Sequence, residues 1–260
     1  MPEEDGATGL PASLEMAWGL RERPGKGPRP TLTLARIVDA AVALAASEGM
    51  DAVSMGRVAK ELGVSTMSLY RYVTAKEELY ILMSDAGVGT PPPPSAGEGA
   101  GWRELLSEWA YAQRAVLMAN SWILRIPITA PPATPNQLAW MERGLAALAG
   151  TGLEEGEKLS TIILIGGLVR NEATMAADMM DAIVKAGLSP EQVLGQYVHT
   201  LHLLTAPDTH PALTRLLESS AFGGSGEPDF QFRFALGRLL DGLADLIDGR
   251  GGSAPRSGSG

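Results

Sequence analysis

The chain has 260 residues, a net charge of −9 and no cysteine. The absence of cysteine excludes disulfides, thiolate metal sites and cysteine-based catalysis. Alanine, leucine and methionine prevail over the β-branched and aromatic residues that favour strands. We therefore expect an all-α protein, long enough to bury a sizeable core.

The acidic charge is unevenly distributed along the chain. Residues 21–85 carry nine basic and eight acidic side chains, whereas residues 86–260 carry twelve and eighteen. Residues 21–36 alone carry five basic side chains and one acidic side chain. The overall acidity therefore does not exclude nucleic-acid binding by a small N-terminal domain.

The hydropathy pattern predicts neither a signal peptide nor a membrane anchor. The first residues are acidic and polar, and the apolar segment Leu159–Val169 is about half of the ~20 residues that a membrane-spanning helix requires. We expect a cytoplasmic protein without membrane partners.

Composition divides the chain into five segments. Residues 1–30 are rich in glycine, proline and charged residues, which predicts a flexible extension with a basic arm. The Ser/Gly-rich residues 249–260 are expected to be a disordered tail. Helical patterns cover residues 31–86 and 102–248, and the Pro/Gly-rich residues 87–101 separate them as a loop. We expect two helical domains.

The first domain is predicted to contain four helices. Thr33 is a suitable N-cap for a helix over Leu34–Ser47, whose apolar residues recur at helical spacing and which Gly49 ends. The next three helices are predicted over residues 55–62, 66 to about 73, and 76 to about 86.

The second and third of these helices are separated by a turn that contains Gly63. Glycine can supply the left-handed backbone that lets two helices meet at roughly 90–120°. Ala59 is small enough for close approach, and Val64 and Leu69 would fill the core between the helices. This helix-turn-helix, Ser54–Val73, could place its second helix in the major groove of DNA. Short helices broken by glycine also occur in proteins that do not bind DNA, so the spacing alone leaves both interpretations open.

Several short motifs occur at fixed spacing between residues 33 and 83. They are Ile37-Val38-Asp39-Ala40-Ala41, Ser47-Glu48-Gly49, Val58-Ala59-Lys60-Glu61-Leu62-Gly63-Val64, Leu69-Tyr70-Arg71-Tyr72-Val73 and Lys76-Glu77-Glu78-Leu79. Together they resemble the N-terminal domain of the TetR family of transcriptional repressors, and the C-terminal half is similar to that of the tetracycline repressor. The resemblance implies an N-terminal three-helix helix-turn-helix DNA-binding domain and a larger C-terminal ligand-binding and dimerisation domain, all-α throughout.

The resemblance also implies which side chains face DNA. Some would contact phosphates (Ser54, Tyr70, Tyr72, Lys76) and others base edges (Thr66, Met67, Ser68, Arg71). The full DNA-binding set is Ser54, Arg57, Ser65, Thr66, Met67, Ser68, Tyr70, Arg71, Tyr72 and Lys76.

Three features of this set leave alternatives open. Gly56 stands where the tetracycline repressor carries a base-reading arginine, which implies a different operator. Tyr72 could instead be a core aromatic whose hydroxyl bonds to the backbone. The basic residues of the segment 21–29 could form an arm that contacts DNA, or a solvated leader without such contacts.

The second domain also shows helical patterns only. Its helices are predicted over Trp102–Ala119, Ser121–Ile126, Asn136–Ala149, Glu154–Ala186, Pro190–Leu204 and Asp229–Ile247. Residues 162–169 are apolar nearly all round, which predicts burial on both sides of that helix. The resemblance implies a homodimer formed by the helices over 154–186 and 229–247; a helix buried entirely within one chain is the alternative. Two operator half-sites would also require a dimer.

Tryptophan, methionine and polar residues mark a candidate effector pocket in the second domain. The resemblance places their helices around a pocket, and large adaptable side chains suit an apolar or aromatic effector. The candidates are Trp102, Trp109, Gln113, Trp122, Trp140, Asn171, Met175, His199 and His202. Tryptophan and methionine at helical spacing are more often plain core, which is the alternative.

Other polar residues of this domain could also have a chemical role. Arg170 and Glu172 interrupt an apolar segment, so each needs a partner or water if it is buried. His199 and His202 lie three residues apart without a carboxylate at helical spacing, so we expect no metal or other cofactor. No catalytic arrangement stands out, and we expect no enzymatic activity.

The function expected from the sequence is a homodimeric, ligand-responsive regulator, in particular a repressor released from its double-stranded DNA operator by a small-molecule effector. One alternative is an all-helical carrier or enzyme with an incidental helix-turn-helix. Another is an activator or global regulator without an effector.

Overall fold

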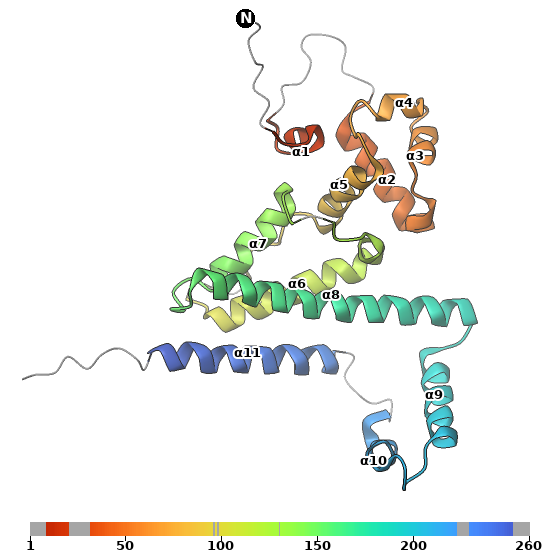
Figure 1. The fold of residues 1–260 in the computed structure, drawn as a ribbon, viewed down its shortest axis with the longest axis vertical. Helices are drawn as coiled ribbons and strands as arrows, with labels where there is room; N and C mark the ends of the chain where they lie inside the picture. Colours follow the sequence, from red (N-terminus) through yellow and green to blue (C-terminus); the bar gives the residue numbers. More distant parts are fainter. Residues whose placement is uncertain are drawn as a thin grey trace, which may run out of the picture.

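The computed structural model describes residues 9–20, 32–95, 97, 99–129, 131–222 and 229–251. Helices are the only regular elements in these ranges, which confirms the all-α prediction (Figure 1). The basic residues of the segment 21–29 and the end of the predicted tail, residues 252–260, lie outside the described residues.

Residues 32–88, the head, form a small helical bundle. Its elements are α2 (Leu34–Glu48), the 3-10 helix η1 (Met50–Ala52), α3 (Met55–Glu61), α4 (Thr66–Leu69) and α5 (Lys76–Val88). Thr33 caps α2 as predicted, because its side chain accepts a hydrogen bond from the Arg36 N–H at 3.2 Å. α4 ends earlier than predicted: after Leu69 the chain tightens, and the Tyr72 N–H donates to the Leu69 carbonyl at 2.8 Å.

The core of the head collects the apolar stripes of its helices. Ile37, Val58, Leu69 and Leu79 have no exposed surface and meet at its centre. Side chains from the 3-10 helix η2 (Ser121–Arg125) and the residue after it, Trp122, Ile123 and Ile126, belong to the same buried cluster. The head is therefore packed directly against a segment of the second half of the chain.

Residues 99–129, 131–186 and 229–251, the body, are built around one long helix. Its helices are α6 (Trp102–Ala119), α7 (Pro135–Ala147), α8 (Glu155–Ala186) and α11 (Phe230–Gly251). α8 packs against α6, α7 and α11, and it runs antiparallel to α11 (Figure 1). The buried cluster between them includes Trp109, Trp140, Ile165 and Phe232.

Residues 190–222, the arm, extend from the end of α8 beyond the body (Figure 1). α9 (Pro190–Leu204) spans the predicted range, whereas the sequence did not predict α10 (Pro211–Glu218) or the short η3 (Ser220–Phe222). Neither α9 nor α10 has a buried residue. The arm therefore gains little stability from the rest of this chain.

The described part of the N-terminal extension contains one helix, α1 (Ala12–Ala17), which contacts α5. Two interactions join this region to the rest of the chain: Ala17 packs on the head core, and the Trp18 indole N–H donates to the Ala133 carbonyl at 2.8 Å. The sequence predicts a flexible extension over residues 1–30 and did not indicate this helix.

Within the described ranges, no helix is both long enough and apolar enough to span a bilayer.

Candidate functional site

The turn between α3 and α4 has the geometry that the helix-turn-helix requires. Gly63 adopts a φ of 67°, the left-handed conformation that glycine enters without steric cost. The Val64 N–H donates to the Ala59 carbonyl at 3.0 Å across the turn. Ser54 is the N-cap of α3, with its hydroxyl accepting from the Arg57 N–H at 3.2 Å. These contacts fix α4 relative to α3.

The side chains around α4 combine one buried anchor with an exposed face. Leu69 is fully buried in the head core, whereas Met67 is 73% exposed and Tyr70 is 43% exposed. Arg71 and Lys76 are also exposed. Large apolar and basic side chains are thus exposed on α4, in the turn after it and at the start of α5, and the buried Leu69 anchors α4 to the head core.

The remaining members of the predicted DNA-binding set lie on or beside this face. Ser65 and Ser68 share a hydrogen bond between their hydroxyls, 2.9 Å apart, and Thr66 between them is partly exposed. Arg57 forms an exposed ion pair with Glu48 at 2.6 Å. An exposed pair of this kind contributes little to stability.

Tyr72 is the member whose geometry favours the alternative reading. Its hydroxyl donates to the Leu32 carbonyl at 2.9 Å, and its ring packs against the head core. This bond occupies the hydroxyl proton and ties the start of α2 to the end of the helix-turn-helix. The position fits a core aromatic better than a phosphate contact.

The tryptophans proposed for the effector pocket are placed mostly in the cores. Trp109 is 2% exposed and donates its indole N–H to the Trp140 carbonyl at 2.9 Å, and Trp140 donates to the Gly89 carbonyl at 2.9 Å. Trp122 lies in the head core, and Trp102 and Gln113 are partly buried on α6. The structure therefore does not gather these side chains around one cavity.

The other pocket candidates lie on outer surfaces. Asn171 and Met175 are exposed on α8, with the Asn171 amide 3.7 Å from the Met175 sulfur. His199 and His202 are exposed on α9, away from the tryptophans. Among the residues described here, no three histidine, cysteine or acidic side chains are grouped so as to hold a metal ion.

Arg170 and Glu172, two residues apart on α8, have different partners. Glu172 accepts two hydrogen bonds from Arg114 at 2.8 and 2.9 Å, and Arg114 also pairs with Asp229 at 3.0 Å. These carboxylates raise the pKa of the Arg114 guanidinium above its ordinary value, with the Glu172 hydrogen bond as the largest cause. Arg170 instead donates to the carbonyls of Leu124 and Ile126 at 3.3 and 3.2 Å.

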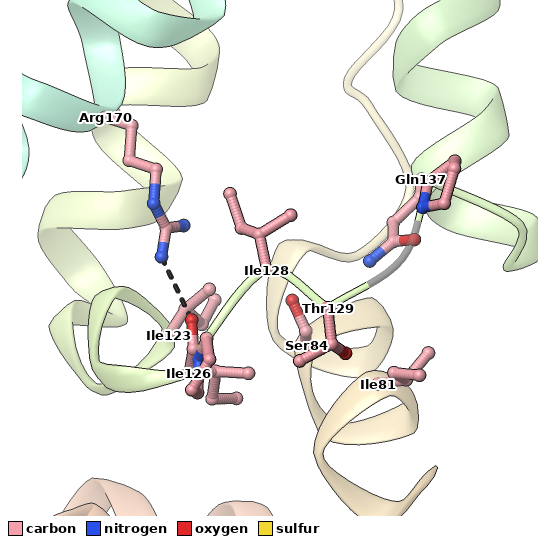
Figure 2. A pocket seen from close by; sticks show the side chains of 10 residues that line it. Ile81, Ser84, Ile123, Ile126, Ile128, Thr129, Gln137 and Arg170 are labelled. Carbon is pink, nitrogen blue, oxygen red and sulfur yellow. Dashed lines mark hydrogen bonds between the residues drawn. The ribbon is translucent and has the colours of Figure 1, made fainter. Parts of the chain in front are cut away.

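A small pocket of about 80 Å³ lies where the head meets the body (Figure 2). α5 contributes Ile81 and Ser84, the segment after η2 contributes Ile128 and Thr129, and α8 contributes Arg170. Apart from Arg170, sequence reasoning did not single out these residues, because they are distant in sequence and ordinary in type.

A second feature is an apolar groove along the outer face of α8 and α11. It is lined by Ile163, Leu164, Gly167, Leu168, Asn171, Ala235 and Leu239. Ile163 is 65% exposed and Leu164 is 57% exposed, although both belong to the most apolar stretch of the chain. One side of α8 is buried in the body, and the opposite side is apolar and open.

Comparisons with known proteins agree with this arrangement. The family model for bacterial regulatory proteins of the tetR family matches residues 37–83, and the model for the tetracyclin repressor-like C-terminal domain matches residues 93–247. The HTH-type transcriptional repressor DrrR1 of Streptomyces coeruleorubidus is 39% identical over 257 residues, covering 97% of this chain and 93% of that protein.

Solved structures show the same fold. Apo ActR from Streptomyces coelicolor superposes with a TM-score of 0.70 at 27% identity, covering 87% of this chain and all of that chain. ActR in complex with actinorhodin gives a TM-score of 0.69, with 85% and 99% covered. From these matches over nearly the whole chain and from the geometry of its helix-turn-helix, the protein belongs to the TetR family of transcriptional regulators.

Proposed function

We propose that the protein is a homodimeric repressor that binds a two-fold symmetric DNA operator and leaves it when a small effector binds. The observation that carries the proposal is the exposed surface of α4 and of the turn after it, where Met67, Tyr70 and Arg71 are exposed on either side of the buried Leu69. Two similar proteins support the proposal: DrrR1 is named as a transcriptional repressor, and the structure of ActR has been solved in complex with actinorhodin. We place this activity in the cytoplasm and ascribe no catalysis to it.

The open apolar face of α8 and α11 supports the dimer. Ile163, Leu164 and Phe234 are each more than half exposed, and contiguous apolar surface of this kind is typical of an interface. Two copies related by a two-fold axis would bring this face against itself as a four-helix contact. The same axis would set two α4 helices toward successive major grooves.

The link between effector and operator is assigned to α5. This helix starts in the head at Lys76 and ends against the body, where Asp85 accepts hydrogen bonds from the N–H groups of Asn136 and Gln137 at 2.9 and 3.0 Å. A ligand that favours one position of α5 would favour one spacing of the two heads. It can shift that equilibrium only by its difference in affinity for the two states.

Selection from a random duplex library tests the proposal. The protein should enrich a motif made of two inverted half-sites whose centres lie about one turn, 10 to 10.5 base pairs, or a multiple of it, apart. An Arg71→Ala variant, folded by circular dichroism, should fail to enrich this motif. Enrichment of no motif by the wild-type protein would contradict the proposal and would favour a helical carrier protein instead.

A further inference from the structure

The pocket between head and body has one charged side chain and an otherwise neutral lining. Arg170 enters from α8, and Ser84, Thr129 and Gln137 supply neutral groups that can donate hydrogen bonds. The rest of the lining is isoleucine and proline. Figure 2 shows Ile128 standing between Arg170 and Gln137. Among the described lining residues there is no carboxylate.

Arg170 differs from the other arginines that α8 meets. Arg114 pairs with Glu172 and Asp229, and Arg125 pairs with Asp178 and Asp181. Arg170 forms no ion pair within the described part of the chain, and its Nη2 donates two long hydrogen bonds to main-chain carbonyls.

The charge of Arg170 is therefore not balanced locally. Burial lowers the pKa of its guanidinium, which nevertheless stays protonated at neutral pH. Its remaining N–H groups are available to a ligand in the pocket.

Asp85, which follows the lining residue Ser84 on α5, is one candidate for a neutralising carboxylate. Its Oδ1 accepts from the backbone of Asn136 and Gln137, and its Oδ2 accepts from the Asn136 amide at 3.1 Å. The start of α7 thus satisfies the hydrogen-bonding capacity of Asp85, and no ion pair in the described part of the chain joins it to Arg170. Arg170 is the one charged side chain in the described lining of the pocket.

We propose that this pocket binds the carboxylate of an otherwise apolar organic acid, with Arg170 as its counter-ion. A space of about 80 Å³ is smaller than the roughly 150 Å³ that encloses benzene, so only the acidic end of a ligand fits within it. The apolar remainder would extend past Ile128, which is 77% exposed at the rim. Guanidinium and carboxylate are geometrically matched for two parallel hydrogen bonds.

The site would also connect ligand and head. Ile81 and Ser84 lie one turn apart on α5, so an occupant touches that helix directly. This consequence rests on the proposed function, in which α5 positions the head. The binding itself does not require it.

Calorimetric titration with benzoate and benzamide, which share a ring and differ in charge, tests the inference in low salt. Benzoate should bind the wild-type protein about fivefold or more tightly than benzamide, because the charge-assisted bond is made only by the acid. Arg170→Gln should reduce this ratio to about one. Arg103→Gln, at an exposed ion pair with Asp241 on the body surface, should leave it unchanged.

A second pair of variants keeps the test decisive if Arg170→Gln does not fold. Ile128→Asp would place a carboxylate beside Arg170 at an exposed position, and Ile128→Asn is its neutral match. The acid-to-amide ratio should fall in the aspartate variant and persist in the asparagine variant. Equal ratios in both, or a loss of preference in Arg103→Gln, would overturn the inference.

These titrations contain no DNA, so they fail independently of the operator selection. If the protein enriches an operator but does not prefer benzoate to benzamide, the proposed acid-binding pocket is refuted and the proposed repressor function is not. If it prefers benzoate but enriches no operator, the repressor function is refuted and the acid-binding pocket is not.

Discussion

Gly87 offers the sharpest test of how the head is joined to the body. It lies next to the end of α5, and a Cβ built there would be 2.7 Å from two ring carbons of Trp122 and 2.8 Å from the Ile123 Cδ1. Carbon atoms in contact are normally about 3.5–4.0 Å apart, so Gly87→Ala would force α5 and η2 apart by roughly 1 Å. Overpacking of this kind costs about 1–3 kcal/mol.

Gly56→Ala is the matched control. Gly56 lies next to the start of α3, and a Cβ there meets nothing within 4 Å. Both substitutions gain up to about 1 kcal/mol from the better helix propensity of alanine. The difference between the two variants therefore isolates the steric effect, and we expect Gly87→Ala to be less stable than Gly56→Ala by about 2 kcal/mol.

Urea unfolding followed by circular dichroism measures this difference, at one protein concentration because a dimer's stability depends on it. Equal stabilities of the two variants would refute the packing of α5 on Trp122. The coupling of head and body through this contact would then have to be abandoned.

Three further predictions address the head, the body and the interface. Tyr72→Phe should lower the free energy of unfolding by about 1 kcal/mol, because the Leu32 carbonyl loses its donor, while operator affinity changes less than about twofold; a large loss of affinity without a loss of stability would restore Tyr72 as a phosphate contact. A double-mutant cycle on Arg114 and Glu172, measured by urea unfolding, should give a coupling energy of about 1–2 kcal/mol, since the pair is bidentate and mostly buried; a coupling near zero would show that the pair does not tie α6 to α8. Leu164→Asp should convert the dimer to monomer in sedimentation at micromolar concentration, and a monomeric wild-type protein would contradict the proposed interface.

Local signals in the sequence predicted much of the fold. Caps, glycines and helical spacing located α2, α6, α8 and α9 to within one or two residues, because these signals act over a few neighbouring residues. The left-handed turn at Gly63 was predicted for the same reason. α10 was missed although Pro211 stands at its first position and its leucines recur at helical spacing; it has only 8 residues, fewer than a helical pattern needs to stand out.

Contacts between distant residues could not be read in this way. A tryptophan at position 122 gives the same sequence pattern whether it lines a pocket or fills a core. Only the fold places Trp122 in the head core beside Gly87. The position of α1 depends on the packing of Ala17 on the head core and on the Trp18 indole, which bonds across 115 residues to Ala133. The sequence predicted that Arg170 and Glu172 need partners if they are buried. It could not predict that Arg114 would pair with Glu172 and Asp229, because that depends on where α6 and α11 meet α8.

The central claim is that the helix-turn-helix reads a DNA sequence. Its most direct test is the ratio of the affinities for the selected operator and for a scrambled duplex of the same length, measured by fluorescence anisotropy at one salt concentration. We predict a ratio of about 10³ or more for the wild-type protein. Arg71→Ala should lower this ratio at least about tenfold, because Arg71 is assigned to a base edge. A ratio near one for the wild-type protein would contradict the account.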